Sequence, residues 1–258
     1  MFVYVLIHPG KPRSTPIPDN AAPLLTPLTP MSGARLAEQA YAALRAAIQD
    51  GQLEPGQRIL ELDLCALLKV SRTPVREALR RLQSDGMVVH APGGGLAVAQ
   101  HDLRALAELY DVRESLEGAA AGLAARNADP AEVQVLQAML AVHHELPDDP
   151  QVQARENKLF HEHIYRAAHN RFLLKALQDL HNAVALLGRT TFAAPGRIEE
   201  AWTEHAGIVA AIARREPDEA ESLARAHVRR GYEIRLKQMV RGAQAGPQPP
   251  IEERRARA

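Results

Sequence analysis

Three histidines and one asparagine in the C-terminal half of the chain are spaced so that they can bind a transition metal. Asn157 and His161 are four residues apart, which puts both side chains on one face of a helix. His205 and His227 fall among the apolar positions of two further helical segments, so they should point inward as well. Imidazole nitrogens with one side-chain oxygen suit Zn²⁺ or Ni²⁺ and leave coordination positions open. The pattern predicts a site for one such divalent ion, although each histidine taken alone is more often a hydrogen-bonded core or surface residue.

The other histidines lack this shared inward placement. We interpret them as ordinary surface or core residues, and they include His143, His144, His163 and His169.

A second group of side chains that can do chemistry is a run of arginines within residues 71–82. The periodicity predicts a helix there, whose buried face would consist of Val75, Ala78, Leu79 and Leu82. Ser71 can cap this helix, and its other side would present Arg72, Thr73, Arg76 and Arg80. Guanidinium groups on a helix that is held by its opposite face can bond to guanine edges or to phosphates in the major groove. The pattern therefore predicts a DNA-reading helix, whereas the stretch taken alone also permits an ordinary solvated helix.

The segments on either side predict the elements that would hold such a helix. An apolar stripe indicates a helix from about residue 34, which Asp50–Gly51 ends, and a Pro–Gly turn then leads into a short strand-like piece. A second short helix ends just before Ser71. Beyond Asp85–Gly86, two apolar stretches on either side of a glycine-rich turn predict a β-hairpin. Three helices and a hairpin within about 65 residues predict a winged helix-turn-helix.

From Asp102 onward the pattern is helical almost without interruption. Proline, glycine and asparagine punctuation divides it into helices at about 102–127, 130–145, 149–168, 171–192, 197–214 and 217–240. We therefore expect a mainly α protein, in which the winged domain is followed by an all-α bundle of six or seven helices.

A signature of several short motifs runs through residues 35–99. It comprises LEPG at 53–56, VSRTPVREAL at 70–79, GMV at 86–88 and the glycines at 93–95. Together these motifs resemble the DNA-binding domain of the GntR family of bacterial transcription regulators.

The resemblance implies roles for individual residues. Arg72 and Arg76 would read bases, and phosphate or minor-groove contacts would come from Ser71, Thr73 and the hairpin, including His90 and Gly94. Arg80 lies on the same side of the helix. A position in the second helix that is sometimes a basic DNA contact in the family is Leu62 here, which removes that contact.

The helical half carries a second set of motifs. They are DVRESLEGAAAGLAA at 111–125, ENKLFHEHIYRAAHN at 156–170, RIEEAWTEHAGIVAAI at 197–212 and AESLARAHV at 220–228. Residues 102–238 thereby resemble the FCD ligand-binding domain of the FadR-type GntR subfamily. The residues at the metal-ligand positions of that domain are Asn157, His161, His205 and His227. Many members have Asp or Asn at the first of these positions, and Asn in place of Asp removes one negative charge, which should weaken metal binding.

The same resemblance places Arg113 in an effector cavity, where its guanidinium can pair with the carboxylate of a small metabolite. Arg113 also stands four residues before Glu117, so an ion pair along the helix is an equally good interpretation.

Composition narrows the class of protein. The 258 residues carry 31 basic and 31 acidic side chains, so the charge that would bind DNA is local. The single cysteine excludes an internal disulfide. No apolar run reaches the roughly 18 residues of a membrane span, so we expect a cytoplasmic protein with no membrane partner. The chain also lacks an HExxH motif, a glycine-rich phosphate loop and a nucleophile elbow, which argues against an enzyme.

We predict four segments. They are a disordered proline-rich extension at 1–32, the winged DNA-binding domain at 33–101, an effector-binding and dimerisation domain at 102–240 and a disordered tail at 241–258. Met31 is an alternative start of the native chain.

The resulting hypothesis is a ligand-responsive transcription regulator. It would act as a repressor, as a homodimer on a palindromic double-stranded operator, and would sense a small carboxylate with the help of the metal. A metal-dependent enzyme and an architectural DNA-binding protein without an effector remain the alternatives.

Overall fold

The computed structural model describes residues 27–28 and 33–244. The predictions of a disordered N-terminal extension, of a start at Met31 and of a tail beyond residue 244 lie outside these residues. The described chain divides into two compact units. The N-terminal unit contains residues 33–48 and 52–99, and the C-terminal unit contains residues 49–51 and 100–244.

The N-terminal unit is a winged helix-turn-helix, as predicted. Its elements are α1 (Gly33–Gln49), β1 (Arg58–Ile59), α2 (Glu61–Leu68), α3 (Arg72–Ser84), β2 (Val88–His90) and β3 (Leu96–Val98). The strands form an antiparallel sheet in the order β1-β3-β2, with Arg58 opposite Ala97 and Val88 opposite Val98. The strand-like piece after the Pro–Gly turn thus joins the hairpin as a third strand. We call residues 88–98 the wing.

Apolar residues spaced along the helices form the core of this unit. Leu44, Leu64 and Leu82 are at most 1% exposed, and Met87 closes the core beside the sheet. Fully burying side chains of this size stabilises the fold by about 1.5–3 kcal/mol each. The core therefore fixes the buried face of α3 and, with it, the direction of the opposite face.

The C-terminal unit is a bundle of helices. Its elements are α4 (Leu103–Asn127), α5 (Pro130–Ala141), the 3₁₀ helix η1 (His143–Glu145), α6 (Pro150–Ala167), α7 (Arg171–Ala185), the 3₁₀ helix η2 (Thr191–Ala193), α8 (Arg197–Ala213) and α9 (Pro217–Gln244). The mainly α fold class is thereby confirmed, with six α-helices among the described residues of this unit.

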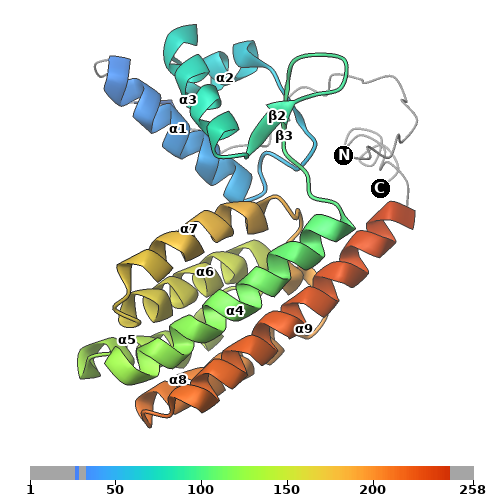
Figure 1. Cartoon of the computed structure of the whole chain (residues 1–258). Coiled ribbons are helices and arrows are strands. Elements are labelled where there is room, and N and C mark those ends of the chain that lie inside the picture. Colours follow the sequence, from blue (N-terminus) through green and yellow to red (C-terminus); the bar gives the residue numbers. More distant parts are fainter. Residues whose placement is uncertain (1–26, 29–32, 245–258) are drawn as a thin grey trace. The chain divides into compact units, whose positions relative to one another are not determined.

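The two longest helices, α4 and α9, lie side by side along the bundle (Figure 1). They run antiparallel, because Tyr110 near the start of α4 packs on Tyr232 near the end of α9, with ring centroids 5.5 Å apart. At the other end, a Cβ added to Gly122 would lie 3.2 Å from the backbone oxygen of Pro217. A glycine there allows the two helices to approach closely.

Three helix ends differ from the predictions. The helix expected to reach residue 192 ends at Ala185, because Leu186 and Leu187 turn into the core and Gly188 takes a left-handed conformation with φ of 82°. The helix expected to reach residue 145 ends at Ala141 and continues as η1. Helix α9 runs to Gln244, so the first four residues of the predicted tail are helical.

The main core of the bundle lies between α4, α5, α6 and α8, where Phe160 and Ile212 are fully buried. Within the described part of the chain, none of the helices is long and apolar enough to span a bilayer.

Candidate functional site

Helix α3 presents three arginines on the side opposite its buried face. The buried residues are Pro74, Val75, Ala78, Leu79 and Leu82. Arg72, Arg76 and Arg80 are exposed, as is Thr73. The periodicity therefore places the guanidinium groups where a nucleic acid can reach them.

Ser71 stands at the N-cap position of α3 with extended backbone, but its hydroxyl makes no capping hydrogen bond. The predicted cap bond is therefore wrong. An N-cap oxygen normally accepts from the second or third backbone N–H of the helix, and here the third helical residue is Pro74, which has none. The hydroxyl thus stays available to another acceptor or donor.

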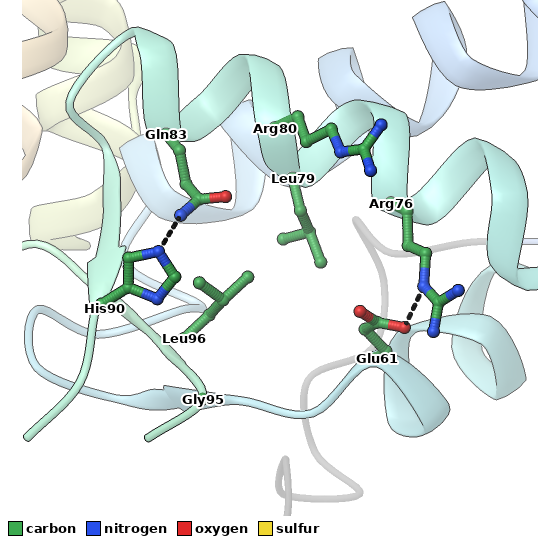
Figure 2. Close-up of a pocket in the computed structure, with 8 residues that line it drawn as sticks. All are labelled: Glu61, Arg76, Leu79, Arg80, Gln83, His90, Gly95 and Leu96. Atoms are coloured by element: carbon green, nitrogen blue, oxygen red, sulfur yellow. Dashed lines mark hydrogen bonds and ion pairs between the residues drawn. The ribbon is translucent and has the colours of Figure 1, made fainter. Parts of the chain in front are cut away.

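A groove of about 410 Å³ lies between α3 and the wing. Figure 2 shows Arg76 and Arg80 extending from α3 and His90 lying across from them on β2. Arg76 is already oriented, because its Nε donates to Glu61 at the start of α2 at 2.8 Å. Within the described residues Arg80 forms no ion pair, so its charge is free for another partner.

The tip of the wing is shaped by glycines. Gly93, Gly94 and Gly95 have φ of 83°, 91° and 80°, a region that other residues rarely adopt. The amide of Gly94 donates to the carbonyl of Ala91 at 3.0 Å. Arg58 Nη2 donates to the carbonyl of Pro92 at 2.8 Å and ties the tip to β1. The wing therefore offers backbone without side chains to an approaching duplex.

Two further residues of this unit do not add positive charge to the surface that would face DNA. One holds two helices together, and the other is apolar. Arg81 bonds to Glu38 and stacks 4.0 Å from the ring centre of Tyr41, so it holds α3 on α1. Leu62 of α2 is 61% exposed, where a basic residue would have added a charge.

In the C-terminal unit the structure brings the three predicted histidines together. His161 comes from α6, His205 from α8 and His227 from α9, and all three are buried. Their ligand nitrogens lie within 4.8 Å of one another. Asn157 stands one turn before His161 on α6, and its side-chain oxygen is buried without a hydrogen-bond partner among the described residues.

Two carboxylates bind the far sides of these rings. Nδ1 of His227 lies 2.6 Å from Glu204, and Nδ1 of His161 lies 3.3 Å from Glu117, a longer contact without hydrogen-bond geometry. Burial opposes ionisation of Glu204, but its hydrogen bond with His227 and the charge of Arg197 hold its pKa below the usual value. Burial likewise raises the pKa of Glu117, yet the nearby positive groups outweigh it and hold that pKa at about 2. Both carboxylates are therefore ionised. Glu204 accepts a hydrogen bond from Nδ1 of His227, and the charge of Glu117 beside His161 favours a proton on Nδ1 of that ring as well.

The inner sides of the rings then hold lone pairs that face one another. With protons on Nδ1, the Nε2 atoms of His161 and His227 are both acceptors, and they lie 3.2 Å apart. Neither nitrogen of His205 has a hydrogen-bond partner among the described residues. Buried acceptors without a donor are costly, and a cation at their centre would satisfy all of them.

Burial also keeps His161 and His205 neutral. It lowers the pKa of His161 to about 3 and the pKa of His205 well below its ordinary value. Neutral imidazole is the form that binds metals, so protons do not compete for these nitrogens near neutral pH.

Arg113 lies beside this cluster and makes the ion pair along α4 that the sequence allowed. Its Nε donates to Glu117 at 2.8 Å, and its guanidinium lies 4.6 Å from the ring centre of Tyr110. Its Nη groups make no hydrogen bond to the described residues. The hydroxyl of Tyr165 is also buried and unpartnered there, and its ring centre is 6.0 Å from that of His161. The predicted role in effector binding stays a prediction.

Sequence reasoning missed Glu204, Glu117 and Arg197 as parts of the site. Arg197 is 3% exposed and pairs with Glu204 at 2.9 Å. A signal existed for Glu204, because it directly precedes His205 in an inward-facing stretch. Its contact is with His227 on another helix, and that pairing depends on tertiary packing.

Comparison with known proteins finds relatives of both units. Residues 36–98 match the family described as bacterial regulatory proteins, gntR family, and residues 108–230 match the FCD domain. The Nta operon transcriptional regulator of Aminobacter aminovorans is 30% identical over 73% of this chain and 89% of its own length. The protein named "Probable D-xylose utilization operon transcriptional repressor" of Paenarthrobacter nicotinovorans is 32% identical over 70% and 80%. Among solved structures, E. coli McbR/YncC is similar with a TM-score of 0.70 and 25% identity, covering 79% of this chain and 98% of that one.

Proposed function

The chain belongs to the GntR family of bacterial transcription regulators and carries an FCD domain, and on that premise we propose that it is a ligand-responsive repressor that binds a palindromic operator as a homodimer. Its relatives are transcription regulators and not enzymes. One of them is named as a probable repressor, and the proposal takes that sign of regulation.

DNA recognition rests on α3 and the wing. Arg72 and Arg76 read base edges, with Arg76 held by Glu61 before DNA arrives. Arg80, Ser71 and Thr73 contact phosphates, while His90 and Gly94 contact the neighbouring backbone or minor groove. One such helix covers only a few base pairs, so a two-fold dimer on a two-fold site is the arrangement that gives sufficient specificity.

Effector sensing rests on the buried cluster of the C-terminal unit. Asn157, His161, His205 and His227 would hold one divalent ion such as Zn²⁺ or Ni²⁺. The buried oxygen of Asn157 and the two nitrogens of His205, which have no hydrogen-bond partner among the described residues, fit that role. When bound, the ion supplies an electrophile that attracts a carboxylate oxygen.

The residues around the cluster would orient a small carboxylate. Glu204 fixes the tautomer of His227, so that Nε2 faces the centre of the cluster. Arg113 keeps Nε on Glu117, which leaves its Nη groups free to form a two-pronged contact with the effector. The hydroxyl of Tyr165 can donate a further hydrogen bond to the same molecule.

The observation that carries the sensing proposal is the 3.2 Å approach of two Nε2 atoms whose Nδ1 atoms face carboxylates, Glu204 at 2.6 Å in a hydrogen bond and Glu117 at 3.3 Å. An architectural DNA-binding protein without an effector would have no need for this arrangement, and apolar side chains would pack there at lower cost.

Operator affinity tests the proposal. An operator is first selected from random duplexes, and binding of Zn²⁺-loaded protein is followed by fluorescence anisotropy with L-malate, succinate or L-lactate added. One acid should weaken operator binding by about 5–150-fold, the usual range of coupling between two sites. The double variant His161→Ala/His205→Ala should bind the operator normally and lose the response.

Arg104→Ala is the matched control, because Arg104 is an exposed arginine of α4 whose one ion pair to the described residues is with Glu108. It should keep both operator binding and the response, whereas Arg113→Ala should lose the response. A response of the double variant equal to that of the wild type would show that the cluster is structural.

A further inference from the structure

We propose a second transition-metal site on the surface of the C-terminal unit, formed by His143 and His144 of η1 and Glu199 of α8. One ligand atom from each of the three residues lies within 4.8 Å of the others. His144 and Glu199 are exposed and His143 is half-buried, so an ion from solution can reach the site. Two imidazoles and a carboxylate suit Cu²⁺, Zn²⁺ or Ni²⁺, with solvent in the remaining positions.

His143 is held in place before any ion binds. Its Nδ1 lies 2.6 Å from the carbonyl of Leu140, so this nitrogen carries the proton and Nε2 carries the lone pair. Its ring stacks on Trp202 of α8 with centroids 5.1 Å apart. A backbone carbonyl on the far nitrogen is the arrangement that orients histidine ligands in metal sites.

Glu199 supplies the negative charge that neutral imidazoles lack. Neighbouring acids of α8 are occupied, since Glu200 and Glu204 both pair with Arg197. Glu199 forms no ion pair with the described residues, and its carboxylate lies beside the two imidazoles instead. An uncompensated carboxylate next to two nitrogen donors favours a cation.

A third group of side chains has similar spacing, but its donor atoms are already bound. Asp129, Glu132 and His169 also lie within 4.8 Å of one another. However, Asp129 and Glu132 form the capping box of α5, and His169 bonds to Glu132 at 2.9 Å. Their donor atoms are committed to the helix end, whereas those of His144 and Glu199 are not.

The proposed surface site is linked to the buried cluster through one residue. The ring centre of Trp202 lies 5.1 Å from that of His143 and 5.1 Å from that of His205. An ion at the surface site would clamp η1 to α8 at this point. The proposal does not depend on the buried site being filled, because no ligand is shared.

Metal content gives the first test. After saturation with Zn²⁺ and dialysis, wild-type protein should retain two ions per chain, one in each site. His143→Ala/His144→Ala should retain one, and His161→Ala/His227→Ala should also retain one. His169→Ala is the control and should retain two. The loss of one ion in His143→Ala/His144→Ala relative to the wild type supports the proposal, whatever the occupancy of the buried site, and an unchanged count in that variant would overturn it.

Fluorescence gives the second test, because Trp202 is the single tryptophan of the sequence. The background is His161→Ala/His227→Ala, which removes the buried site without changing His205 beside the indole. Cu²⁺ should quench Trp202 there. Adding Glu199→Gln should raise the half-maximal Cu²⁺ concentration by about tenfold or more, since even outer-shell partners of metal ligands change affinity by about 10–100-fold, while circular dichroism stays unchanged. Equal quenching with and without His143 and His144 would also overturn the proposal.

Discussion

Replacing Glu204 should weaken metal binding at the buried cluster without unfolding the protein. Glu204 contacts Nδ1 of His227 at 2.6 Å, and it pairs with Arg197. Loss of its carboxylate frees the proton of His227 to move to the other ring nitrogen, which removes a donor from the metal. Arg197 keeps a second acid, because Glu200 lies 3.3 Å away. The folded structure should therefore survive the change.

The size of the effect follows from the contacts. Outer-shell partners of metal-bound histidines change metal affinity by about 10–100-fold, or about 1.4–2.7 kcal/mol. Glu204→Gln keeps an acceptor oxygen and loses only the charge, so it should lie near the lower figure. Glu204→Ala loses both and should lie near the upper figure. Glu117 makes a longer contact of 3.3 Å with His161 and should control the tautomer less strongly.

Competition with a chromophoric zinc chelator measures the affinity, and long-range ¹⁵N NMR reports which nitrogen of His227 carries the proton. Glu200→Gln is the matched control, since Glu200 is on the same helix and pairs with Arg197 and Arg230 but makes no contact with an imidazole in the structure. It should change neither quantity. Unchanged affinity in Glu204→Ala, or equal losses in Glu204→Ala and Glu200→Gln, would refute the reasoning.

Three further predictions concern DNA, the core and pH. In gel shifts, Arg76→Ala should cost about 1–3 kcal/mol of operator-binding free energy and relax the preference at one base pair. Arg80→Ala should weaken binding to all duplexes alike and reduce the slope of log affinity against log salt concentration by about 1. Unchanged base discrimination in Arg76→Ala would contradict the assignment of α3 as the reading helix. In urea unfolding, Leu82→Ala should lower the free energy of unfolding by about 2–5 kcal/mol, because Leu82 is fully buried. Leu62→Ala should change it by no more than about 0.5 kcal/mol, because Leu62 is exposed. Similar values for the two variants would contradict the described core. In chelator-treated protein, the free energy of unfolding should fall as pH drops from 6.5 towards 4.5. The pKa of His161 is about 3 in the folded chain, so over this pH range only the unfolded chain binds a proton there. The slope should approach about 1.4 kcal/mol per pH unit for each such histidine and be smaller in His161→Asn, and a flat profile would count against a buried neutral histidine.

The fold could be predicted because its elements are strongly periodic and clearly punctuated. Helix α4 begins one residue after Asp102, which caps it through a bond from the amide of Ala105 at 2.8 Å. The errors lie where tertiary packing decides the end of an element. Gly188 ends α7 early because Leu186 and Leu187 are buried, and a leucine pair looks the same at the end of a helix as within one.

In the candidate site, the sequence predicted which side chains share a face of one helix, but not which side chains of different helices contact each other. Asn157 and His161 share a face by their four-residue separation, and apolar neighbours indicate that His205 points inward. The partners of these residues come from other helices. Glu204 stands beside His205 in the chain but contacts His227, and Arg76 contacts Glu61 across a turn. Such pairings depend on how the helices pack, which periodicity does not specify.

The most direct test of the account is the difference in bound Zn²⁺ between wild-type protein and the double variant His161→Ala/His205→Ala. Both are saturated, dialysed together and measured by elemental analysis per chain. We predict that the variant retains one ion fewer than the wild type and still binds the operator. Equal metal content in the two proteins would mean that the buried histidines hold no ion, and the proposed metal-assisted sensor would be wrong.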